Sequence, residues 1–171
     1  MVDMIMRRAH MSELAVLKEM YARIVERMNA RELAIWDDVY PVEFLQNDIE
    51  CNSLYVFERS GSIVAACALS DQPSFENQLG WSGGKDSAIY LDRFGVNVEH
   101  SRQGAGTQAL ELIEQWSREQ GAGYLRLLVA CSNLPAIALY EKCGFIRVAG
   151  THREVFDDGS FLEEFGYEKR L

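Results

Sequence analysis

The sequence is poor in the residues that usually build metal sites. It contains three histidines and four cysteines among 171 residues, and no two cysteines form a Cys-x-x-Cys pair. The ligand spacings of a structural zinc site are therefore missing, and no metal is expected. The cysteines are best explained as free thiols, because an unpaired cysteine behaves as a small hydrophobic residue.

Long hydrophobic runs are also missing. The longest apolar run, Ile63 to Leu69, is far shorter than the roughly 20 residues that cross a bilayer. Asp3, Arg7 and Arg8 surround a brief apolar stretch at the N-terminus, which is unlike a signal peptide. These absences predict a cytoplasmic protein without a membrane partner.

Proline is scarce, with three residues, and no residue type forms a low-complexity run. A hydrophobic content of 48% and a charged content of 25% are near the averages of globular proteins. A chain of 171 residues suffices for one domain with a proper core. We therefore expect a single domain over residues 1–171.

Positive charge is in deficit: the formal net charge is −9. This balance opposes binding to nucleic acid and favours cationic small molecules. Many proteins are acidic only for solubility, so the charge does not identify a substrate.

Hydrophobic spacing predicts alternating strands and helices. The first helix is expected to carry Leu14 to Met28 behind Ser12 as its N-cap, and the second to begin after Pro41. The other helices are expected at residues 106–120 and 135–142. Strands are expected at residues 4–9, 54–58, 63–69, 88–98, 124–130, 145–148 and 161–168. The order β-α-α-β-β-β-α-β-α-β-β indicates an α/β domain with a mixed sheet.

The segment from Val96 to Gly106 is the most informative part of the chain. A predicted strand enters a loop with two glycines, and the loop opens directly into a helix. Glycines let the backbone approach a ligand, and the first N–H groups of a helix are unsatisfied donors at its positive end. This pattern favours a phosphate or pyrophosphate, to which Arg102 could add a charged contact.

Two families use such a loop. Gly104-x-Gly106-x-x-Ala109 fits the loose dinucleotide fingerprint of a Rossmann fold. That fold places its glycines at the strand end and a carboxylate at the end of the next strand. Here polar residues separate Val98 from Gly104, and the next strand ends in Cys131-Ser132-Asn133. The surroundings of the glycines therefore do not match those of a Rossmann fold, and this interpretation is rejected.

The loop resembles instead the pyrophosphate loop of the GNAT acetyltransferases, Arg/Gln-x-x-Gly-x-Gly/Ala. Downstream, the segment from Asn133 to Phe145 matches the N-x-x-A-x-x-x-Y-x-x-x-G-F block of that superfamily. The resemblance covers about residues 54–150. More loosely, residues 36–41 and 165–169 resemble an uncharacterised bacterial branch of small acetyltransferases.

The resemblance implies a GNAT-like, mostly antiparallel central sheet flanked by helices, with acetyl-CoA as cosubstrate. Backbone groups of Val96 and Val98 would pair with the pantetheine arm as an added strand, and Gly95 is a candidate for a β-bulge beside them. One departure concerns the first motif position, which is Ser101 rather than Arg or Gln; Arg102 comes one place late. The expected cosubstrate-binding residues are Val96, Asn97, Val98, Ser101, Arg102, Gln103, Gly104, Ala105, Gly106, Thr107, Asn133, Ala136 and Tyr140.

Two residues are candidates for catalysis. The match to the family motif favours Tyr140 as the group that protonates the departing thiolate, with packing beneath the cosubstrate as the alternative. Asp92 alternates with Tyr90 and Phe94 on one face of its strand and is the best carboxylate to accept the proton of the amine. A salt bridge is the alternative for Asp92, and Glu76 and Asp86 are further candidates. Trp36, Tyr40 and Trp81 are candidates to line an acceptor pocket or to belong to the core.

The reaction expected from the resemblance is direct transfer of an acetyl group to a primary amine of a small molecule. No cysteine nucleophile is needed, because Cys131 lacks a histidine partner in the motif. Two alternatives stay open: acetylation of protein N-termini, and a non-catalytic acyl-CoA sensor on the same fold. No nucleic acid is expected as a partner, and a homodimer stays open.

Overall fold

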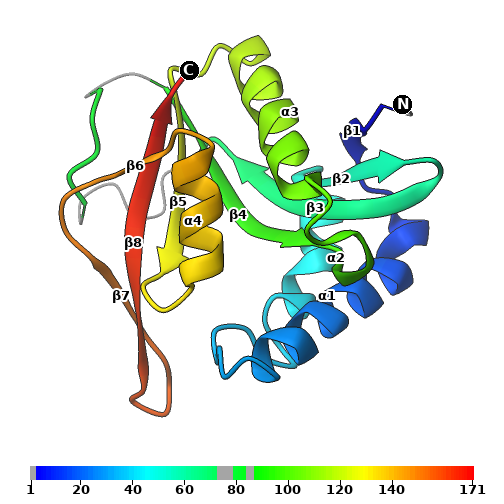
Figure 1. The fold of residues 1–171 in the computed structure, drawn as a ribbon, viewed down its shortest axis with the longest axis horizontal. Coiled ribbons are helices and arrows are strands. Elements are labelled where there is room, and N and C mark those ends of the chain that lie inside the picture. The colour runs from blue at the N-terminus through cyan, green and yellow to red at the C-terminus, as the bar shows by residue number, and fades with distance from the viewer. Residues whose placement is uncertain (1–2, 73–78, 84–86) are drawn as a thin grey trace. The chain divides into compact units, whose positions relative to one another are not determined.

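The computed structural model describes residues 3–72, 79–83 and 87–171 (Figure 1). Glu76 and Asp86 lie outside these residues. The chain forms two compact units. Unit 1 comprises Met1–Leu69 and Asp92–Ile113, and unit 2 comprises Ser70–Leu91 and Glu114–Leu171.

Unit 1 consists of helices packed on antiparallel strands. Its strands are β1 (Ile5–Arg8), β2 (Leu54–Arg59), β3 (Ser62–Ser70) and the second part of β4 (Ala88–Val96). Its helices are α1 (Leu14–Asn29), α2 (Leu45–Glu50) and the first part of α3 (Ala105–Glu119), with the 3-10 turns η1 (Met11–Glu13), η2 (Val42–Phe44) and η3 (Val98–His100). The β2–β3 turn has positive φ at Ser60 (54°) and Gly61 (78°), as a tight hairpin requires.

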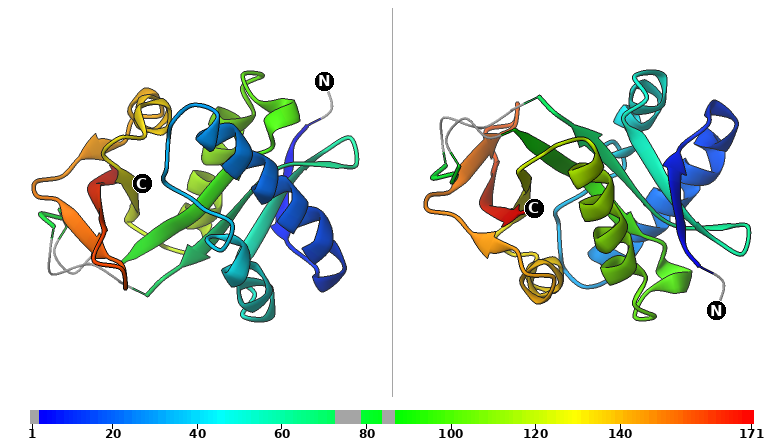
Figure 2. Two further views of the ribbon diagram at one scale, coloured as in Figure 1. Left: turned by 90° about the horizontal axis from the view of Figure 1, so that it is seen from below. Right: turned by 90° about the horizontal axis from the view of Figure 1, so that it is seen from above.

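Alternation along β2 and β3 gives unit 1 two apolar faces. Leu54 and Val56 pack with Ala66 and Ala68 against Leu17, on the side of α1. Residues between them, such as Tyr55 and Phe57, point to the opposite face because strand side chains alternate. Figure 2 shows α1 in front of these strands in one view and α3 in front of them in the other.

Unit 2 contains the first part of β4, the end of α3 and the C-terminal elements. These are β5 (Tyr124–Ala130), α4 (Leu134–Lys142), β6 (Ile146–Arg147), β7 (His152–Val155) and β8 (Phe161–Arg170). The long strand β8 pairs antiparallel with β5, β6 and β7. β4 pairs parallel with β5, from Ala88↔Tyr124 to Leu91↔Leu127.

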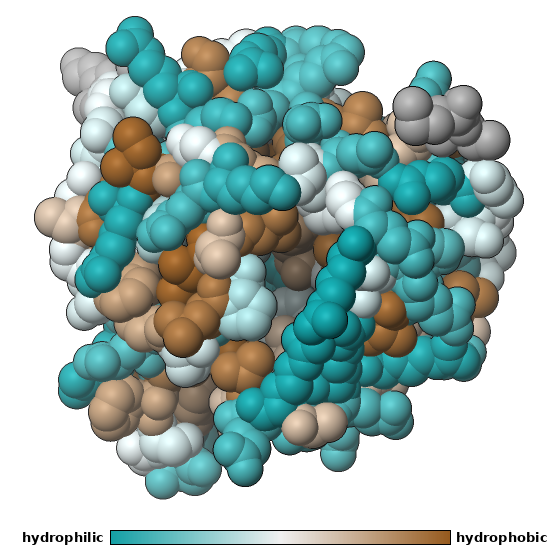
Figure 3. Space-filling model, viewed as in Figure 1, coloured by the Kyte–Doolittle hydropathy of each residue, from teal (hydrophilic) through white to brown (hydrophobic). Residues whose placement is uncertain are grey.

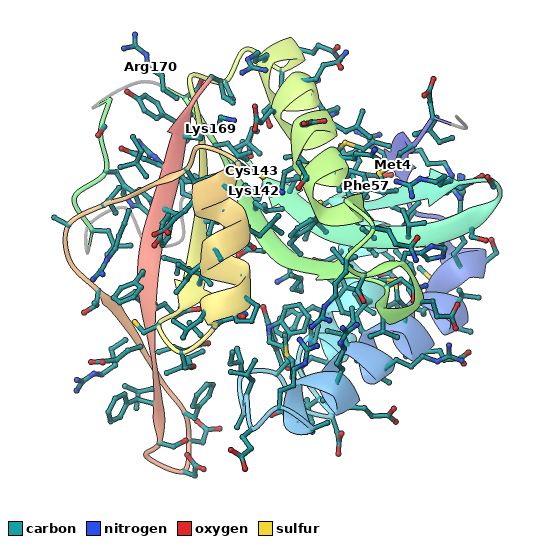
Figure 4. All side chains as sticks on the ribbon, viewed as in Figure 1. Met4, Phe57, Lys142, Cys143, Lys169 and Arg170 are labelled. Carbon is teal, nitrogen blue, oxygen red and sulfur yellow. The ribbon has the colours of Figure 1, made fainter. Side chains whose placement is uncertain are left out.

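Polar contacts fasten α4 to β8. Lys169 Nζ donates to the Cys143 carbonyl at the end of α4 at 2.6 Å (Figure 4). The Tyr167 hydroxyl donates to Glu141 Oε1 at 2.8 Å. The last turn of α4 is thus held against β8, the strand with which β6 and β7 also pair.

The predicted fold class is confirmed: the sheet is mixed, β4–β5 is its parallel pair, and the pairs β1–β2, β2–β3, β5–β8, β6–β8 and β7–β8 are antiparallel. Two local expectations were wrong, and one strand was not predicted. Ser12 lies inside η1 rather than capping α1, and the Glu13 carboxylate accepts from the His10 N–H at 2.8 Å instead. Val98 lies in η3 rather than in a strand. β7 was not predicted, because most of its side chains are polar and exposed.

None of the helices in the described part of the chain combines the length and the apolar character that a bilayer span requires.

Candidate active site

The second part of β4 carries a residue with left-handed backbone. Arg93 has φ of 51°, a conformation that costs a side-chain-bearing residue energy and persists only where its surroundings enforce it. Asp48 on α2 accepts from Arg93 Nε at 2.8 Å and from Nη2 at 3.0 Å. The Tyr21 hydroxyl on α1 donates to the Arg93 carbonyl at 2.6 Å, and the Phe44 ring lies 5.3 Å from the guanidinium. Two helices of unit 1 thus fix residue 93.

Gly95 was expected as a candidate for a β-bulge, whereas the residue of β4 with positive φ is Arg93, two positions earlier. Gly95 has another reason to lack a side chain. A Cβ at this position would come within 2.9 Å of Ile24 Cδ1 and 3.0 Å of Tyr21 Cε1, so α1 packs directly on the strand backbone. This close approach brings the Tyr21 hydroxyl within reach of Arg93.

Asp92, the predicted base, lies beside Arg93 and is half-buried. Burial raises the pKa of its carboxyl group; the Arg93 charge opposes this rise and the Asp48 charge adds to it. Among the described residues its carboxylate has no hydrogen-bond or ion-pair partner, because Arg93 is engaged by Asp48. The ion pair that the described residues form next to Asp92 is the one between Arg93 and Asp48.

Aromatic side chains form a row in the same unit. The ring centroids of Tyr21 and Trp36 are 5.8 Å apart, those of Trp36 and Tyr40 are 6.3 Å apart, and those of Tyr40 and Phe44 are 5.6 Å apart. Trp36 and Tyr40 are half-buried. Two of the three aromatic residues expected near an acceptor are thus neighbours, in the row that ends at Arg93.

The third, Trp81, belongs to a different group in unit 2. Its ring lies 5.2 Å from the guanidinium of the buried Arg126. Arg126 also donates to the Tyr90 hydroxyl at 3.1 Å and to the Ser82 carbonyl at 2.6 Å. Tyr90 and Trp81 therefore surround a buried arginine of β5.

The β4–α3 loop, residues 97–104, begins with a polar cap. The Asn97 N–H donates to the Val64 carbonyl at 2.9 Å, and its side-chain oxygen accepts from the Glu99 N–H at 3.1 Å. This cap starts η3 and ends the strand at Val96. The Val98 carbonyl accepts from the Ser101 hydroxyl at 2.8 Å. Because that carbonyl is engaged and Val98 is not extended, the expected strand-like pairing of Val98 with a pantetheine arm does not fit; Val96 is still in the strand.

The end of the loop exposes backbone donors. Gly104 has φ of 77°, and a Cβ there would meet no atom within 4 Å. The first helical bond of α3 runs from Gln108 N to Gly104 O at 3.0 Å, so the N–H groups of Ala105, Gly106 and Thr107 precede it. Ala105 is buried and anchors the turn, whereas Gly106 and Thr107 are half-buried. An anion here would meet free N–H groups at the positive end of a 15-residue helix.

Side chains of the loop differ in their contacts. Arg102 is exposed, with φ of 62° and no partner among the described residues. Gln103 Nε2 donates to the Glu99 carbonyl at 3.3 Å. The Ser101 hydroxyl accepts from Arg27 Nη1 at 2.5 Å. Sequence reasoning missed Arg27, Asp48 and Arg93, because each reaches its partner across 45 or more positions and no motif marks them.

The second motif block lies in unit 2. Asn133 caps α4, accepting from the Ala136 N–H at 3.3 Å, and among the described residues no group accepts from its side-chain NH₂. Tyr140 is 7% exposed, and its ring packs edge-on against Phe145 at 5.7 Å. Apolar side chains gather over α4 (Figure 3), where Ala136 is half-buried and Leu134 is 69% exposed.

Cys131 follows β5 and is half-buried. Burial raises the pKa of its thiol, and the nearby Glu163 carboxylate adds to the rise. A thiol with a raised pKa stays protonated at neutral pH, which makes it a poor nucleophile.

A mixed sheet with a parallel β4–β5 pair, and a glycine loop between β4 and a helix, define the acyltransferase architecture that the sequence resembles. The Acetyltransferase (GNAT) family matches residues 17–145, which is most of the chain. The chain therefore belongs to the GNAT acetyltransferase family.

Individual relatives agree with this membership. The chain is 26% identical over 135 residues to YobR of Bacillus subtilis (strain 168), described as an uncharacterized N-acetyltransferase. The match covers 78% of this chain and 54% of that protein, so the chain spans about half the length of this curated relative.

Solved structures share the fold. A GNAT-family acetyltransferase from Listeria monocytogenes superposes with a TM-score of 0.73 at 20% identity, covering 99% of this chain and 96% of the other. The putative acetyltransferase yncA from Salmonella typhimurium, solved with its cofactor acetyl-CoA, gives 0.67 at 20% identity, covering 98% and 94%.

Proposed function

We propose that this protein transfers the acetyl group of acetyl-CoA to a primary amine of a small molecule by direct attack. The observation that carries the proposal is Asp92: a half-buried carboxylate with a raised pKa and no partner among the described residues, beside a backbone fixed in a strained conformation. Perturbed carboxylates of this kind are enriched at active sites.

The loop before α3 is proposed to hold the pyrophosphate of the cosubstrate. In unit 1 the free N–H groups at the start of α3 suit the pyrophosphate, and Gly104 leaves open space before the loop backbone. The family motif separately assigns Asn133, Ala136 and Tyr140 to cosubstrate binding. Acetyl-CoA in a structure of the same fold supports this choice.

The chemistry requires three proton transfers during the reaction. A protonated amine gives one proton to Asp92, directly or through water, and its lone pair forms the N–C bond to the acetyl carbon. The backbone N–H groups of β4 polarise the carbonyl oxygen. The C–S bond then breaks, the thiolate takes a proton from Tyr140, and the product nitrogen loses its second proton to solvent. Asp92 then releases its proton to solvent and Tyr140 regains one from it, which resets both groups.

The acceptor is proposed to approach the aromatic row of unit 1. Trp36 and Tyr40 lie in one group with Phe44 and Arg93, and Asp92 directly precedes Arg93 on the strand. Aromatic faces favour cationic and apolar groups, which suits an amine with a hydrophobic body.

The test is a pH–rate profile of the parent protein and of Asp92→Asn, with a panel of amines and thiol release as the readout. In the parent, kcat/KM should rise with pH through the raised pKa of Asp92 and then level off. In the variant, activity lost at neutral pH should partly return at high pH, because only amine that is already deprotonated reacts. Asp71→Asn, which alters an exposed carboxylate, is the matched control and should keep the parent profile.

Other outcomes would redirect the assignment. Profiles of the same shape would place the base elsewhere, with Glu76 next to test. Acetyl-CoA binding without turnover of any amine or peptide would indicate a sensor. Turnover of peptide N-termini alone would indicate a protein acetyltransferase.

A further inference from the structure

The loop has serine where the family motif has Arg or Gln, and this hydroxyl is not free. Ser101 Oγ donates to the Val98 carbonyl at 2.8 Å and accepts from Arg27 Nη1 at 2.5 Å. The same nitrogen of Arg27 lies 3.3 Å from the Val98 carbonyl. A guanidinium from α1 is thus held at the motif position that lacks a cation of its own.

Arg27 keeps its charge available. It is half-buried, and none of the described carboxylates lies within ion-pair distance of it. Its bonds use a single nitrogen and two neutral acceptors, whereas a guanidinium offers five N–H donors. Both Nε and Nη2 therefore remain for another acceptor.

Arg23, one turn earlier on α1, shows the contrast. It donates to Glu19 Oε1 and to Glu99 Oε1, both at 2.6 Å. Both arginines contact the segment from Asn97 to Ser101, but two carboxylates compensate the charge of Arg23. The loop therefore has one neutralised and one uncompensated arginine beside it.

Arg102 is the other cation in reach of the loop, and it is less well prepared. It is exposed and makes no bond with the described residues, so ordering its side chain on a ligand would cost conformational entropy. Arg27 is already fixed by its bonds to residues 98 and 101. A side chain held in its bound position loses less entropy on binding.

We propose that Arg27 supplies, from α1, the side-chain contact to the pyrophosphate that the loop lacks at Ser101. The inference rests on the proposed use of acetyl-CoA. Its planar fork suits two phosphate oxygens at once, which a lysine cannot match. Arg27 of α1 thereby replaces the Arg or Gln side chain that the motif position lacks. The small Ser101 side chain leaves space for the guanidinium and forms a hydrogen bond with it.

The experiment compares two ligands, acetyl-CoA and S-acetyl-pantetheine, which lacks the pyrophosphate. Calorimetry gives the Kd of each for the parent and for Arg27→Gln. We expect the variant to bind acetyl-CoA at least about tenfold more weakly, the size expected for one charged phosphate contact. Binding of S-acetyl-pantetheine should change by less than about twofold, and the preference for acetyl-CoA should fall accordingly.

Three further variants sharpen the result. Arg23→Gln is the matched control on the same helix and should keep the parent preference. Arg102→Gln tests the rival and should have a smaller effect than Arg27→Gln. Arg27→Lys keeps the charge but lacks the planar guanidinium, and it should weaken acetyl-CoA binding by an intermediate factor. This variant also tests the role of Arg27 if the glutamine variant does not fold.

The outcomes separate the inference from the function on which it rests. A parent that prefers acetyl-CoA, with Arg27→Gln keeping the same preference, would overturn the role of Arg27 alone. Equal weakening of both ligands would also overturn it, since Arg27 would then only fasten the loop to α1. A parent that binds neither ligand would overturn the proposed function, and the role of Arg27 with it.

Discussion

Two strand arginines, the half-buried Arg93 of unit 1 and the buried Arg126 of unit 2, are compensated differently. In unit 1, Arg93 makes a bidentate pair with Asp48, at 2.8 Å and 3.0 Å. In unit 2, Arg126 lies within 6.0 Å of the centroids of Trp81, Tyr90 and Tyr124, and its ion pair to Glu168 spans 3.5 Å. The first arrangement enforces a left-handed residue beside Asp92, a carboxylate without a partner in the described part of the chain. The second ties β4, β5, β8 and residues 81–82 together. The comparison assigns positioning to Arg93 and stability to Arg126.

The largest effect on stability is expected from a substitution of Arg126. Arg126→Met would leave the buried Glu168 without its cation, which costs about 3–5 kcal/mol. For a chain of this size we expect a Tm lower by on the order of 10 °C in thermal unfolding. The double variant Arg126→Met/Glu168→Gln should recover part of the loss, because no uncompensated charge is left. A single variant as stable as the parent would mean that the aromatic rings, not the charge, set the stability.

The next effect tests whether unit 2 also takes part in the chemistry. Tyr140→Phe keeps the ring that packs on Phe145 and removes the hydroxyl. We expect kcat to fall about a hundredfold, with cosubstrate affinity nearly unchanged. Tyr167→Phe, which removes the hydroxyl bonded to Glu141, is the matched control and should stay close to the parent. An equally fast Tyr140→Phe, with chemistry shown to be the slow step, would leave unit 2 with a packing role here.

The sequence predicted much of this arrangement, for reasons visible in particular residues. Apolar β-rich residues define β5, which was predicted with its observed bounds, Tyr124–Ala130. Asn133 was expected as an N-cap because it lies between a strand and a helix, and it is one. The loop and the start of α3 follow from local chemistry, since Gly104 has the positive φ that glycine allows.

What escaped prediction depends on contacts between distant residues. Asp48 and Arg93 are 45 positions apart, and Arg27 and Ser101 are 74 apart. No periodicity marks such pairs, because each partner alone is compatible with a solvated polar side chain. Arg93 also adopts φ of 51° because of its neighbours, not because of its own residue type.

A smaller effect, on acetyl-CoA affinity, tests the proposed binding role of the α3 N-terminus in unit 1. Gly106→Val places a β-branched side chain where the backbone must approach phosphate. We expect the Kd for acetyl-CoA to rise at least about tenfold in calorimetry, which is about 1.4 kcal/mol. Glu111→Val, an exposed site farther along α3, controls for the helix propensity of valine and should bind normally. Unchanged affinity in a folded Gly106→Val protein would remove the pyrophosphate assignment.

The smallest effect concerns stability at Asp92. Because its pKa is raised in the folded state, its contribution to stability is full below the unfolded pKa of about 3.9 and is lost as pH rises through the folded pKa. Asp92→Asn avoids this loss. We expect the Tm of the variant to exceed that of the parent at neutral pH, and the difference to shrink as the pH falls toward the unfolded pKa. A variant less stable than the parent at neutral pH would instead indicate a structural ion pair at Asp92.

The absence of a side chain at Gly95 affects the backbone geometry next to Asp92. Its missing side chain sets the spacing between α1 and β4, because Ile24 and Tyr21 fill the space that a Cβ would need. The Tyr21 hydroxyl reaches the Arg93 carbonyl only at that spacing. Positions 21, 24 and 95 are therefore expected to vary together during evolution. A lineage that gains a methyl group at 95 should shrink a residue on the helix, and a change of volume with no change of charge could retune the candidate base.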